Sequence, residues 1–301
     1  MIDAAFRCPV CGSGNCLPHL TLTDRMFATT AATFSLVRCS GCGLLRLHPR
    51  PDAATLDAAY GPGYTPHERS GLSGRAKSWL ERRSVRKLQR YLAAPRAVLD
   101  VGCATGDLLL AIRDTGNPNV TGVETGHDAA EVARARGLDV RIGDLQDAAF
   151  ADAAFDTVIL SHTIEHVPDP AATLAEVARV LRPGGALILW LPNVESIEAR
   201  LLRSYWIGYD APRHLTTFGV STLRNALARA GLTVADVRHE AVGLEWAWAL
   251  RLFARDRLPA AEPLLRRLHP LLIVAATPLA AVGALVGRSG RVRVTAVKPE
   301  E

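Results

Sequence analysis

The feature that most constrains this chain is an apolar strand that runs directly into a turn of small residues and then into a helix. Residues 97–101 are apolar around Asp100, residues 102–106 are small, and an apolar helical pattern follows over 108–113. Small residues let the backbone approach a bound molecule, and the start of a helix offers unpaired N–H groups at the same place. The segment predicts a strand–loop–helix ligand site.

A second apolar strand, residues 119–123, ends at Glu124, twenty-four residues after Asp100. An acid at that position is placed to accept hydrogen bonds from a ribose diol. The turn is not a dinucleotide fingerprint, because the third position from Gly102 is Ala104 and the sixth is an aspartate, which is poorly suited to a pyrophosphate. The two strands together predict a nucleoside site and make hydride transfer a minor alternative.

These residues resemble the first motif of the class I S-adenosylmethionine-dependent methyltransferases, acid-x-Gly-x-Gly-x-Gly, with Ala104 in place of the central glycine. Over roughly residues 85–240 the resemblance continues in order. It includes a third strand with its adenine-flanking acid at 142–145, a fourth strand at 155–160, the following loop at 161–170, and a Pro-Gly-Gly turn before the strand 186–191.

The resemblance implies an α/β fold: a Rossmann-like, mostly parallel sheet of seven strands with one antiparallel edge strand. It also implies S-adenosylmethionine as cofactor. The cofactor-binding residues that it implies are Asp100, Gly102, Cys103, Ala104, Gly106, Glu124, Asp144, Leu145 and Ser161.

Four of the six cysteines form two CxxC pairs, Cys8/Cys11 and Cys39/Cys42, each followed at once by a glycine. Two such turns supply the four thiolates of a closed tetrahedral zinc site. We therefore expect residues 1–48 to form a zinc ribbon with strands such as 33–38, in which a structural zinc ion replaces a core. Buried free cysteines would not explain the paired spacing, and a redox pair needs only one CxxC beside a βαβ unit.

Residues 49–95 are expected to hold a proline- and glycine-rich linker and a basic amphipathic helix over 74–92. Its basic side chains could grip phosphates, although solvation of the outer face of a packing helix is the favoured interpretation. The methyltransferase domain would then span 96–301. The net charge of +5 is a mild bias that does not by itself indicate a nucleic-acid partner.

The cysteine pairs, together with residues 42–44, 49–51 and 210–215, resemble a narrower branch in which a zinc ribbon precedes the methyltransferase domain. Members of that branch include sugar C-methyltransferases and enzymes of cell-envelope saccharide pathways. The resemblance implies a small or lipid-linked saccharide as the acceptor.

Methyl transfer requires an aligned nucleophile and, for a hydroxyl or an acidic carbon, removal of a proton. Histidine suits the second task, and His162 and His214 are the candidates for a base or a substrate-orienting group. Glu165 and His166 are further candidate catalytic residues. Because His162, Glu165 and His166 stand at i, i+3 and i+4, they could also converge on a divalent ion, as an acid-x-x-Glu-His cluster does in some related O-methyltransferases.

Residues 241–290 are expected to form an apolar helical insertion before a last strand at 291–297. Trp246 and Trp248 stand among arginines, and twenty residues from Leu268 to Gly287 carry no formal charge. The alternatives are peripheral membrane contact through 243–287, a dimer or substrate surface, and a membrane span. The first twenty residues lack an apolar run of signal-peptide length, so a cytoplasmic location is expected, with contact at the inner membrane face as a further option.

Two rival functions remain open. Zinc ribbons and basic helices also occur in rRNA methyltransferases, although the base-clamping Asn-Pro-Pro-Tyr-like signature is missing and only 191–193 resembles it. A non-catalytic protein that keeps the nucleotide fold as a binding scaffold is the second rival, because Ala104 departs from the motif.

Overall fold

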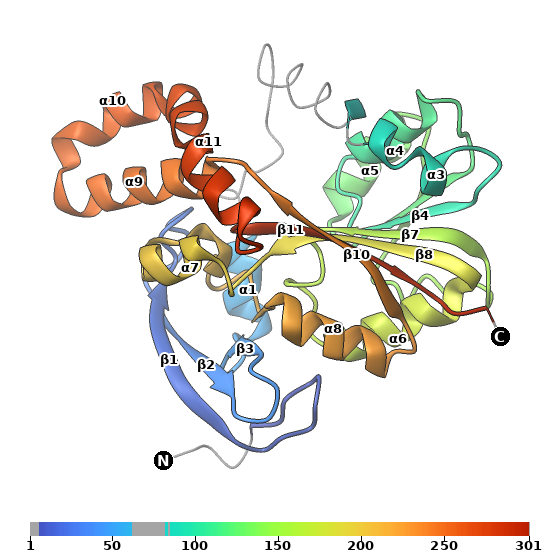
Figure 1. Ribbon diagram of the computed structural model, residues 1–301, viewed down its shortest axis with the longest axis horizontal. Helices are drawn as coiled ribbons and strands as arrows, with labels where there is room; N and C mark the ends of the chain where they lie inside the picture. Colours follow the sequence, from blue (N-terminus) through green and yellow to red (C-terminus); the bar gives the residue numbers. More distant parts are fainter. Residues whose placement is uncertain (1–5, 62–81, 84, 301) are drawn as a thin grey trace.

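The computed structural model describes residues 6–61, 82–83 and 85–300. Its main feature is a seven-stranded sheet with the order β10-β11-β8-β7-β4-β5-β6 (Figure 1). The strands are β4 (Val98–Val101), β5 (Val120–Glu124), β6 (Asp139–Ile142), β7 (Phe155–Ser161), β8 (Leu181–Pro192), β10 (Thr233–Glu240) and β11 (Arg291–Val297). Every residue of β4 is buried, as expected for a parallel strand covered on both faces.

The sheet has one antiparallel strand, as expected, but the prediction that this strand lies at the edge is wrong. β11 is antiparallel to both neighbours, β8 and β10, so it lies one place inside the edge. The edge strand β10 therefore runs parallel to the central strands. After β10 the chain passes through the insertion and returns between β8 and β10, which leaves β10 outermost.

Helices cover the sheet on both faces. One face packs against α3 (Gln89–Leu92), α4 (Asp107–Arg113) and α5 (His127–Ala135), and the other against α6 (Pro170–Val180) and α8 (Val220–Arg229) (Figure 1). Each face of the sheet has its own hydrophobic core, and successive residues of β4 alternate between them. Val98 packs on the side of α3, α4 and α5, and Leu99 packs on the side of α6 and α8. The side chain of Asp169 caps α6 by accepting hydrogen bonds from two backbone N–H groups, both at 3.0 Å. The doubly wound α/β architecture is confirmed.

A smaller sheet has the order β1-β2-β3-β9 and is built from β1 (Cys16–Thr23), β2 (Thr33–Cys39), β3 (Leu45–Leu47) and β9 (Thr216–Thr217). Its last strand comes from far along the chain. The N-terminal residues Phe6, Cys8 and Leu44 also share one hydrophobic core with Leu223 and Leu227 of α8. Residues on either side of position 50 are therefore packed together. The helix α1 (Ala53–Ala59) follows this sheet.

The expected basic helix over 74–92 falls partly on 74–81 and 84, which lie outside the described residues. Within the described part, residues 82–83 and 85–87 are helical and α3 continues the segment.

The apolar insertion lies where the sequence predicts it, between β10 and β11. It consists of α9 (Leu244–Arg257), η3 (Pro259–Ala261), α10 (Glu262–Arg267) and α11 (His269–Leu285), which project beside α7 (Ile197–Leu202) (Figure 1). Two short turns, η1 (Arg203–Tyr205) and η2 (Ile207–Tyr209), follow α7. Among the described residues no single helix is long and apolar enough to cross a bilayer; 259–267 and 269–285 meet that criterion only together and are bent by 87°.

Candidate active site

The turn after β4 and the end of β5 lie side by side. The two strands are parallel neighbours, with Asp100 opposite Gly122 and Val101 opposite Val123. In the turn, Gly102, Ala104 and Gly106 all have left-handed backbones, with φ of 75°, 49° and 80°. The sequence prediction that the small-residue turn adjoins the tip of the next strand is therefore confirmed in the geometry.

Glu124 joins the turn to its surroundings. Its Oε2 accepts a hydrogen bond from the Ala104 N–H at 2.8 Å, and its Oε1 accepts one from the Gly126 N–H at 2.7 Å. Its backbone carbonyl accepts from the Gly143 N–H at 3.0 Å, which brings the predicted Asp144 segment to the same strand end. A non-glycine residue in the left-handed region is disfavoured by about 1 kcal/mol, and the bond from Glu124 helps to hold Ala104 there.

The other residues predicted to bind the cofactor differ in how far their side chains are exposed to solvent. The side chains of Asp100, Cys103 and Leu145 are buried, and burial raises the pKa of the Cys103 thiol. Any contact that Cys103 or Leu145 makes with a cofactor must therefore use backbone atoms. Asp144 is exposed, and its carboxylate accepts a hydrogen bond from the Asp147 N–H at 2.8 Å. Ser161 is half-buried at the end of β7.

The loop after β7 packs directly on the glycine turn. Thr163 donates a hydrogen bond from Oγ1 to the carbonyl of Val101 at 2.8 Å. A Cβ at Gly102 would stand only 2.7 Å from that same Oγ1, so the close approach requires glycine there. This contact places the candidate catalytic residues 162–166 beside the predicted cofactor turn.

Within this loop, His162 and Glu165 form a pair. Nδ1 of His162 lies 3.2 Å from Oε1 of Glu165, and the His162 side chain is 37% exposed, whereas the Glu165 side chain is 2% exposed. Burial alone would raise the pKa of Glu165, but the hydrogen bond from His162 and the nearby His214 and His166 lower it to about 2. Glu165 is thus a buried anion that faces a partly exposed imidazole.

His214 reaches the same loop from the segment before β9. The Leu215 N–H donates to the Glu165 carbonyl at 2.8 Å, and the rings of His166 and His214 meet edge to face with centroids 4.6 Å apart. Nδ1 of His214 lies 2.9 Å from the Gly208 carbonyl. Burial, and then the neighbouring His214, lower the pKa of His166 to about 4. His162, Glu165, His166 and His214 are therefore brought together, as the sequence predicts for one site.

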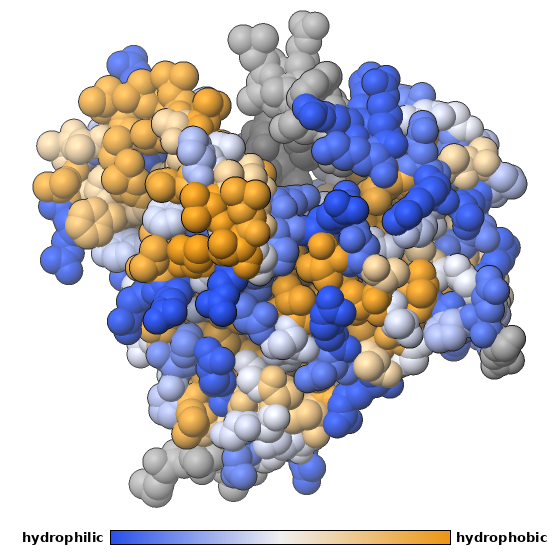
Figure 2. All heavy atoms as spheres, in the orientation of Figure 1, coloured by the Kyte–Doolittle hydropathy of each residue, from blue (hydrophilic) through white to orange (hydrophobic). Residues whose placement is uncertain are grey.

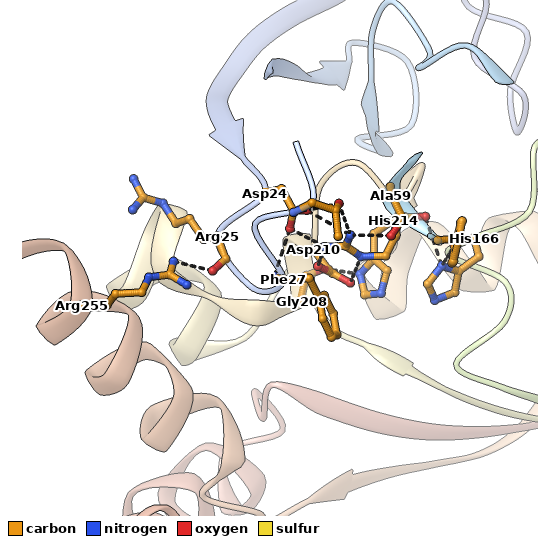
Figure 3. A network of polar contacts seen from close by, with 12 residues as sticks. Asp24, Arg25, Phe27, Ala59, His166, Gly208, Asp210, His214 and Arg255 are labelled. Carbon is orange, nitrogen blue, oxygen red and sulfur yellow. Dashed lines mark hydrogen bonds and ion pairs between the residues drawn. The ribbon is translucent and has the colours of Figure 1, made fainter. Parts of the chain in front are cut away.

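The 210–215 segment is held by a buried guanidinium that sequence reasoning missed. Arg213 is fully buried and forms ion pairs with Asp24 at 2.6 Å and Asp210 at 2.7 Å, and it donates to the Ala59 carbonyl at 3.2 Å (Figure 3). The i, i+3 spacing of Asp210 and Arg213 was a local signal, but nothing in the sequence connects either residue to Asp24. This network ties the N-terminal sheet to the backbone that carries His214.

Among the described residues, one ligand atom from each of Glu165, His166 and His214 lies within 4.8 Å of the other two. We call this set the histidine cluster. The sequence places His162 in a metal-binding set with Glu165 and His166, but the structure puts His214 in its place. The reason is local, since residues 162–166 form no regular helix and Nδ1 of His162 is directed to Glu165.

Cys8, Cys11, Cys39 and Cys42 converge, and we call them the cysteine cluster. Their sulfur atoms lie within 4.8 Å of one another, with Cys8 to Cys42 and Cys11 to Cys39 each at 3.5 Å. Four thiolates at about 2.3 Å from a tetrahedral zinc ion would lie about 3.8 Å apart, so the spacing fits a metal, whereas a disulfide requires about 2.05 Å.

Backbone N–H groups in the second CxxC turn favour the thiolate form of Cys39. Burial opposes ionisation of Cys39, but N–H groups of Cys42 and Gly41 lower its pKa to about 7. By contrast, burial raises the pKa of Cys8 to about 11. The turns also close as the sequence indicates, since the N–H of the following glycine donates to the first cysteine's carbonyl at 2.9 Å in each turn.

Comparison with known proteins decides the family. A family model described as a methyltransferase domain matches residues 75–237, more than half of the chain. The chain belongs to this methyltransferase family. The methyltransferase is similar to a SAM-dependent methyltransferase from Archaeoglobus fulgidus, with 20% identity over 73% of this chain and 94% of the other, and a TM-score of 0.53. It is equally similar in fold to the [4+2]-cyclase SpnF, with 21% identity over 84% of this chain and 98% of the other, and a TM-score of 0.53.

Curated relatives match part of the methyltransferase. The O-methyltransferase cnsE of Penicillium expansum is 29% identical over 150 residues, 46% of this chain and 53% of the relative. The ubiquinone biosynthesis O-methyltransferase of Xanthomonas oryzae pv. oryzae is 39% identical over 99 residues, 31% of this chain and 41% of the relative. The chain thus spans about half or less of the length of these relatives.

Proposed function

We propose that this protein transfers the methyl group of S-adenosylmethionine to an oxygen of a small or lipid-linked saccharide-type acceptor, with His162 as the base. The observation that carries the proposal is the pairing of a partly exposed imidazole with the buried Glu165 carboxylate beside the glycine turn. The names of the O-methyltransferase relatives support oxygen as the acceptor atom. The saccharide is supported by the resemblance of the cysteine pairs and residues 210–215 to the zinc-ribbon branch.

The residues around the turn fit the cofactor. The turn 102–106 brings small residues and the N-terminus of α4 to one place, and Glu124 offers carboxylate oxygens at the tip of β5. When bound there, S-adenosylmethionine supplies an electrophilic methyl group. Glu124 would accept hydrogen bonds from the ribose, and the loop 161–166, which packs on the turn through Thr163, would border the transferred group.

His162 is the better base of the two candidates. A carboxylate can only accept, so Nδ1 of His162 carries the hydrogen that faces Glu165, and Nε2 keeps the lone pair that can take a proton from the acceptor hydroxyl. The buried carboxylate then stabilises the imidazolium that forms. His214 is only 9% exposed, with Nδ1 beside the Gly208 carbonyl, and is placed to orient rather than to exchange protons with solvent.

The base is tested with His162→Asn, with His127→Asn on the exposed surface of α5 as the matched control. We expect His162→Asn to lower kcat at least ~100-fold while calorimetric affinity for S-adenosylmethionine stays at the wild-type value. The control should behave as wild type. Wild-type turnover in His162→Asn would overturn the assignment of the base.

The acceptor is tested by incubation with labelled S-adenosylmethionine and fractionated cell-envelope extract. Label in a lipid-linked or soluble saccharide fraction supports the proposal, and label in rRNA supports the rival rRNA methyltransferase. Cofactor binding without transfer to any fraction would favour a binding scaffold. SpnF, a cyclase with the same fold, illustrates why the fold alone does not decide the reaction.

We also propose that the cysteine cluster holds a structural zinc ion. Four sulfur ligands fill a tetrahedral site and leave no position for a substrate, which suits a structural role. Cys16, which lies outside the set, is buried at the start of β1 and is an ordinary core thiol.

A lipid-linked acceptor would suit the surface of the insertion, and we propose that residues 243–287 contact an anionic membrane surface. Figure 2 shows hydrophobic side chains gathered over α10 and α11. The exposed fractions of Leu271, Val274 and Leu285 are 66%, 71% and 87%, and Arg266 and Arg267 stand at the end of α10. Apolar side chains beside arginines suit the interface of a membrane with anionic headgroups.

Flotation with phosphatidylglycerol vesicles tests this contact. Val274→Glu should reduce the bound fraction severalfold, and Val132→Glu, at an exposed position on α5, should leave it unchanged. Equal flotation of both variants, or a change in oligomeric state in place of flotation, would contradict the membrane proposal and favour a dimer surface.

A further inference from the structure

The histidine cluster brings together atoms that can only accept hydrogen bonds. Nδ1 of His214 lies 2.9 Å from the Gly208 carbonyl and Nδ1 of His166 lies 3.1 Å from the Arg213 carbonyl. A carbonyl cannot donate, so in both rings Nδ1 carries the hydrogen and Nε2 keeps a lone pair. The hydroxyl of Tyr60, 2.9 Å from the same Nδ1 of His166, can share that hydrogen.

The third member of the cluster, Glu165, adds a carboxylate with one oxygen that accepts no hydrogen bond among the described residues. Oε1 of Glu165 faces His162, whereas Oε2 is buried and has no hydrogen-bond partner among the described residues. A buried carboxylate oxygen without a partner costs free energy. One ligand atom of Glu165 lies within 4.8 Å of one from each of the two rings, and a cation held among them would offset the repulsion between the carboxylate and the imidazole lone pairs.

We propose that Glu165, His166 and His214 bind a divalent transition-metal ion such as Zn²⁺ or Mn²⁺. Two imidazoles and one carboxylate are a donor set that such ions accept. The two backbone carbonyls that fix the Nδ1–H tautomers are the partners that metal-bound histidines typically have. Ligand atoms bound at about 2.1 Å lie about 3.4 Å apart in tetrahedral geometry, so side-chain shifts of about 1 Å would close the cluster around an ion.

Three protein ligands leave coordination positions open, which distinguishes this site from the cysteine cluster. This step rests on the proposed function: the ligand that would take the open position is the hydroxyl group of the acceptor. An ion held there would lower the pKa of the acceptor hydroxyl. The hydroxyl proton would pass to Nε2 of His162 as the O–H bond breaks, and the oxygen electron pair would form the new bond to the methyl carbon. The electron pair of the breaking carbon–sulfur bond would return to sulfur, which leaves as a neutral thioether.

The experiment measures metal binding without cofactor or acceptor, so its outcome does not depend on the methyl-transfer proposal. Manganese binding to the full-length protein is followed by electron paramagnetic resonance, since Mn²⁺ prefers oxygen and nitrogen ligands to thiolates. We expect one Mn²⁺ site in the wild type, at least ~10-fold weaker binding in His214→Asn and Glu165→Gln, and unchanged binding in the control His127→Asn. Zinc in the cysteine cluster, measured by mass spectrometry, should be equal in all four proteins.

Two outcomes would overturn the proposal: no Mn²⁺ or added Zn²⁺ bound beyond the cysteine cluster, or equal binding in wild type and both variants. Circular dichroism identifies a variant that fails to fold, and Glu165→Gln, which keeps the side-chain shape, then replaces His214→Asn as the deciding protein. His162→Asn separates the two proposals, because it should keep the Mn²⁺ site and lose turnover. Metal binding with no loss of turnover in that variant would remove the base and leave the metal site standing.

Discussion

The cysteine cluster and the histidine cluster are two candidate metal sites built in opposite ways. The first takes four soft ligands from two short turns, and each turn is closed by its own glycine. The second takes three harder ligands from two loops, which meet because buried Arg213 anchors one of them. Four thiolates fill a tetrahedral site, whereas three mixed ligands leave room for a substrate oxygen. Ligands paired within short turns, as in the cysteine cluster, therefore suit a structural metal site. Ligands that depend on a buried ion pair to meet, as in the histidine cluster, suit a site that takes part in the reaction.

The largest effect should come from Cys39→Ser. Loss of one thiolate should release zinc, and because binding to a metal couples to folding of the segments that supply its ligands, the sheet β1-β2-β3-β9 should open. Hydrogen exchange should rise over residues 16–47 and 208–217, while β4 to β8 stay protected. Unaltered zinc content would refute the four-thiolate site, and exchange confined to the N-terminal residues would show that the two clusters are independent.

Asp24→Asn tests the link between the two clusters. The variant leaves Arg213 with one charge partner fewer in a fully buried position, which should cost about 3 to 5 kcal/mol of unfolding free energy. Asp152→Asn is the matched control, because its ion pair with Arg179 is largely exposed and should contribute less than about 1 kcal/mol. Equal denaturant midpoints for the two variants would contradict the anchoring role.

The same ion pair predicts a pH dependence. Burial would raise the pKa of Asp24, but the hydrogen bonds from Arg213 and Thr29 lower it to about 2, below its ordinary 3.8. The folded state therefore binds this proton less readily than the unfolded state, so the stabilisation is fully present above about pH 4 and is lost as the pH falls toward 2. Urea unfolding at pH 5 and pH 3 should show a smaller loss of stability in Asp24→Asn than in the wild type.

Glu124→Ala should weaken cofactor binding without affecting metal binding in either cluster. Loss of hydrogen bonds to the ribose should weaken affinity for S-adenosylmethionine by about 1 to 3 kcal/mol. Zinc and manganese binding should stay unchanged, because the Glu124 carboxylate accepts hydrogen bonds from Ala104 and Gly126 and belongs to neither cluster. Unchanged calorimetric affinity for the cofactor would remove Glu124 from the site.

Ala104→Gly should have the smallest effect. Glycine adopts the left-handed backbone without penalty, so the variant should gain up to about 1 kcal/mol of stability, offset in part by the extra freedom of the unfolded chain. Thermal unfolding measures it, and cofactor affinity should be equal to or tighter than that of the wild type. A clear loss of stability would mean that the Ala104 methyl group makes contacts that outweigh its backbone strain.

The sequence predicts this molecule best where function depends on neighbours along the chain. The glycine turn, the Glu124 strand tip and the two CxxC turns are each specified by a few adjacent residues, and the structure has each geometry. The position of β11 inside the edge could not be read from its residues, because a buried apolar strand carries the same pattern whether it pairs at the edge or one place inside it. Nor could the sequence show that His214 stands beside Glu165 and His166, since the segment 210–215 that carries His214 is anchored by a charge pair between Asp24 and Arg213, 189 residues apart.

The strand β9 has a consequence for any attempt to obtain a smaller catalyst. It pairs with β3 directly after His214 and Leu215, and Arg213 just before them forms ion pairs with Asp24 and Asp210. A shortened chain that began at residue 96 would leave Arg213 with Asp210 but without Asp24 and the Ala59 carbonyl, and would leave β9 without its neighbour β3. The first sixty residues therefore support the segment that carries His214, and we expect that trimming them lowers turnover even where the cofactor still binds.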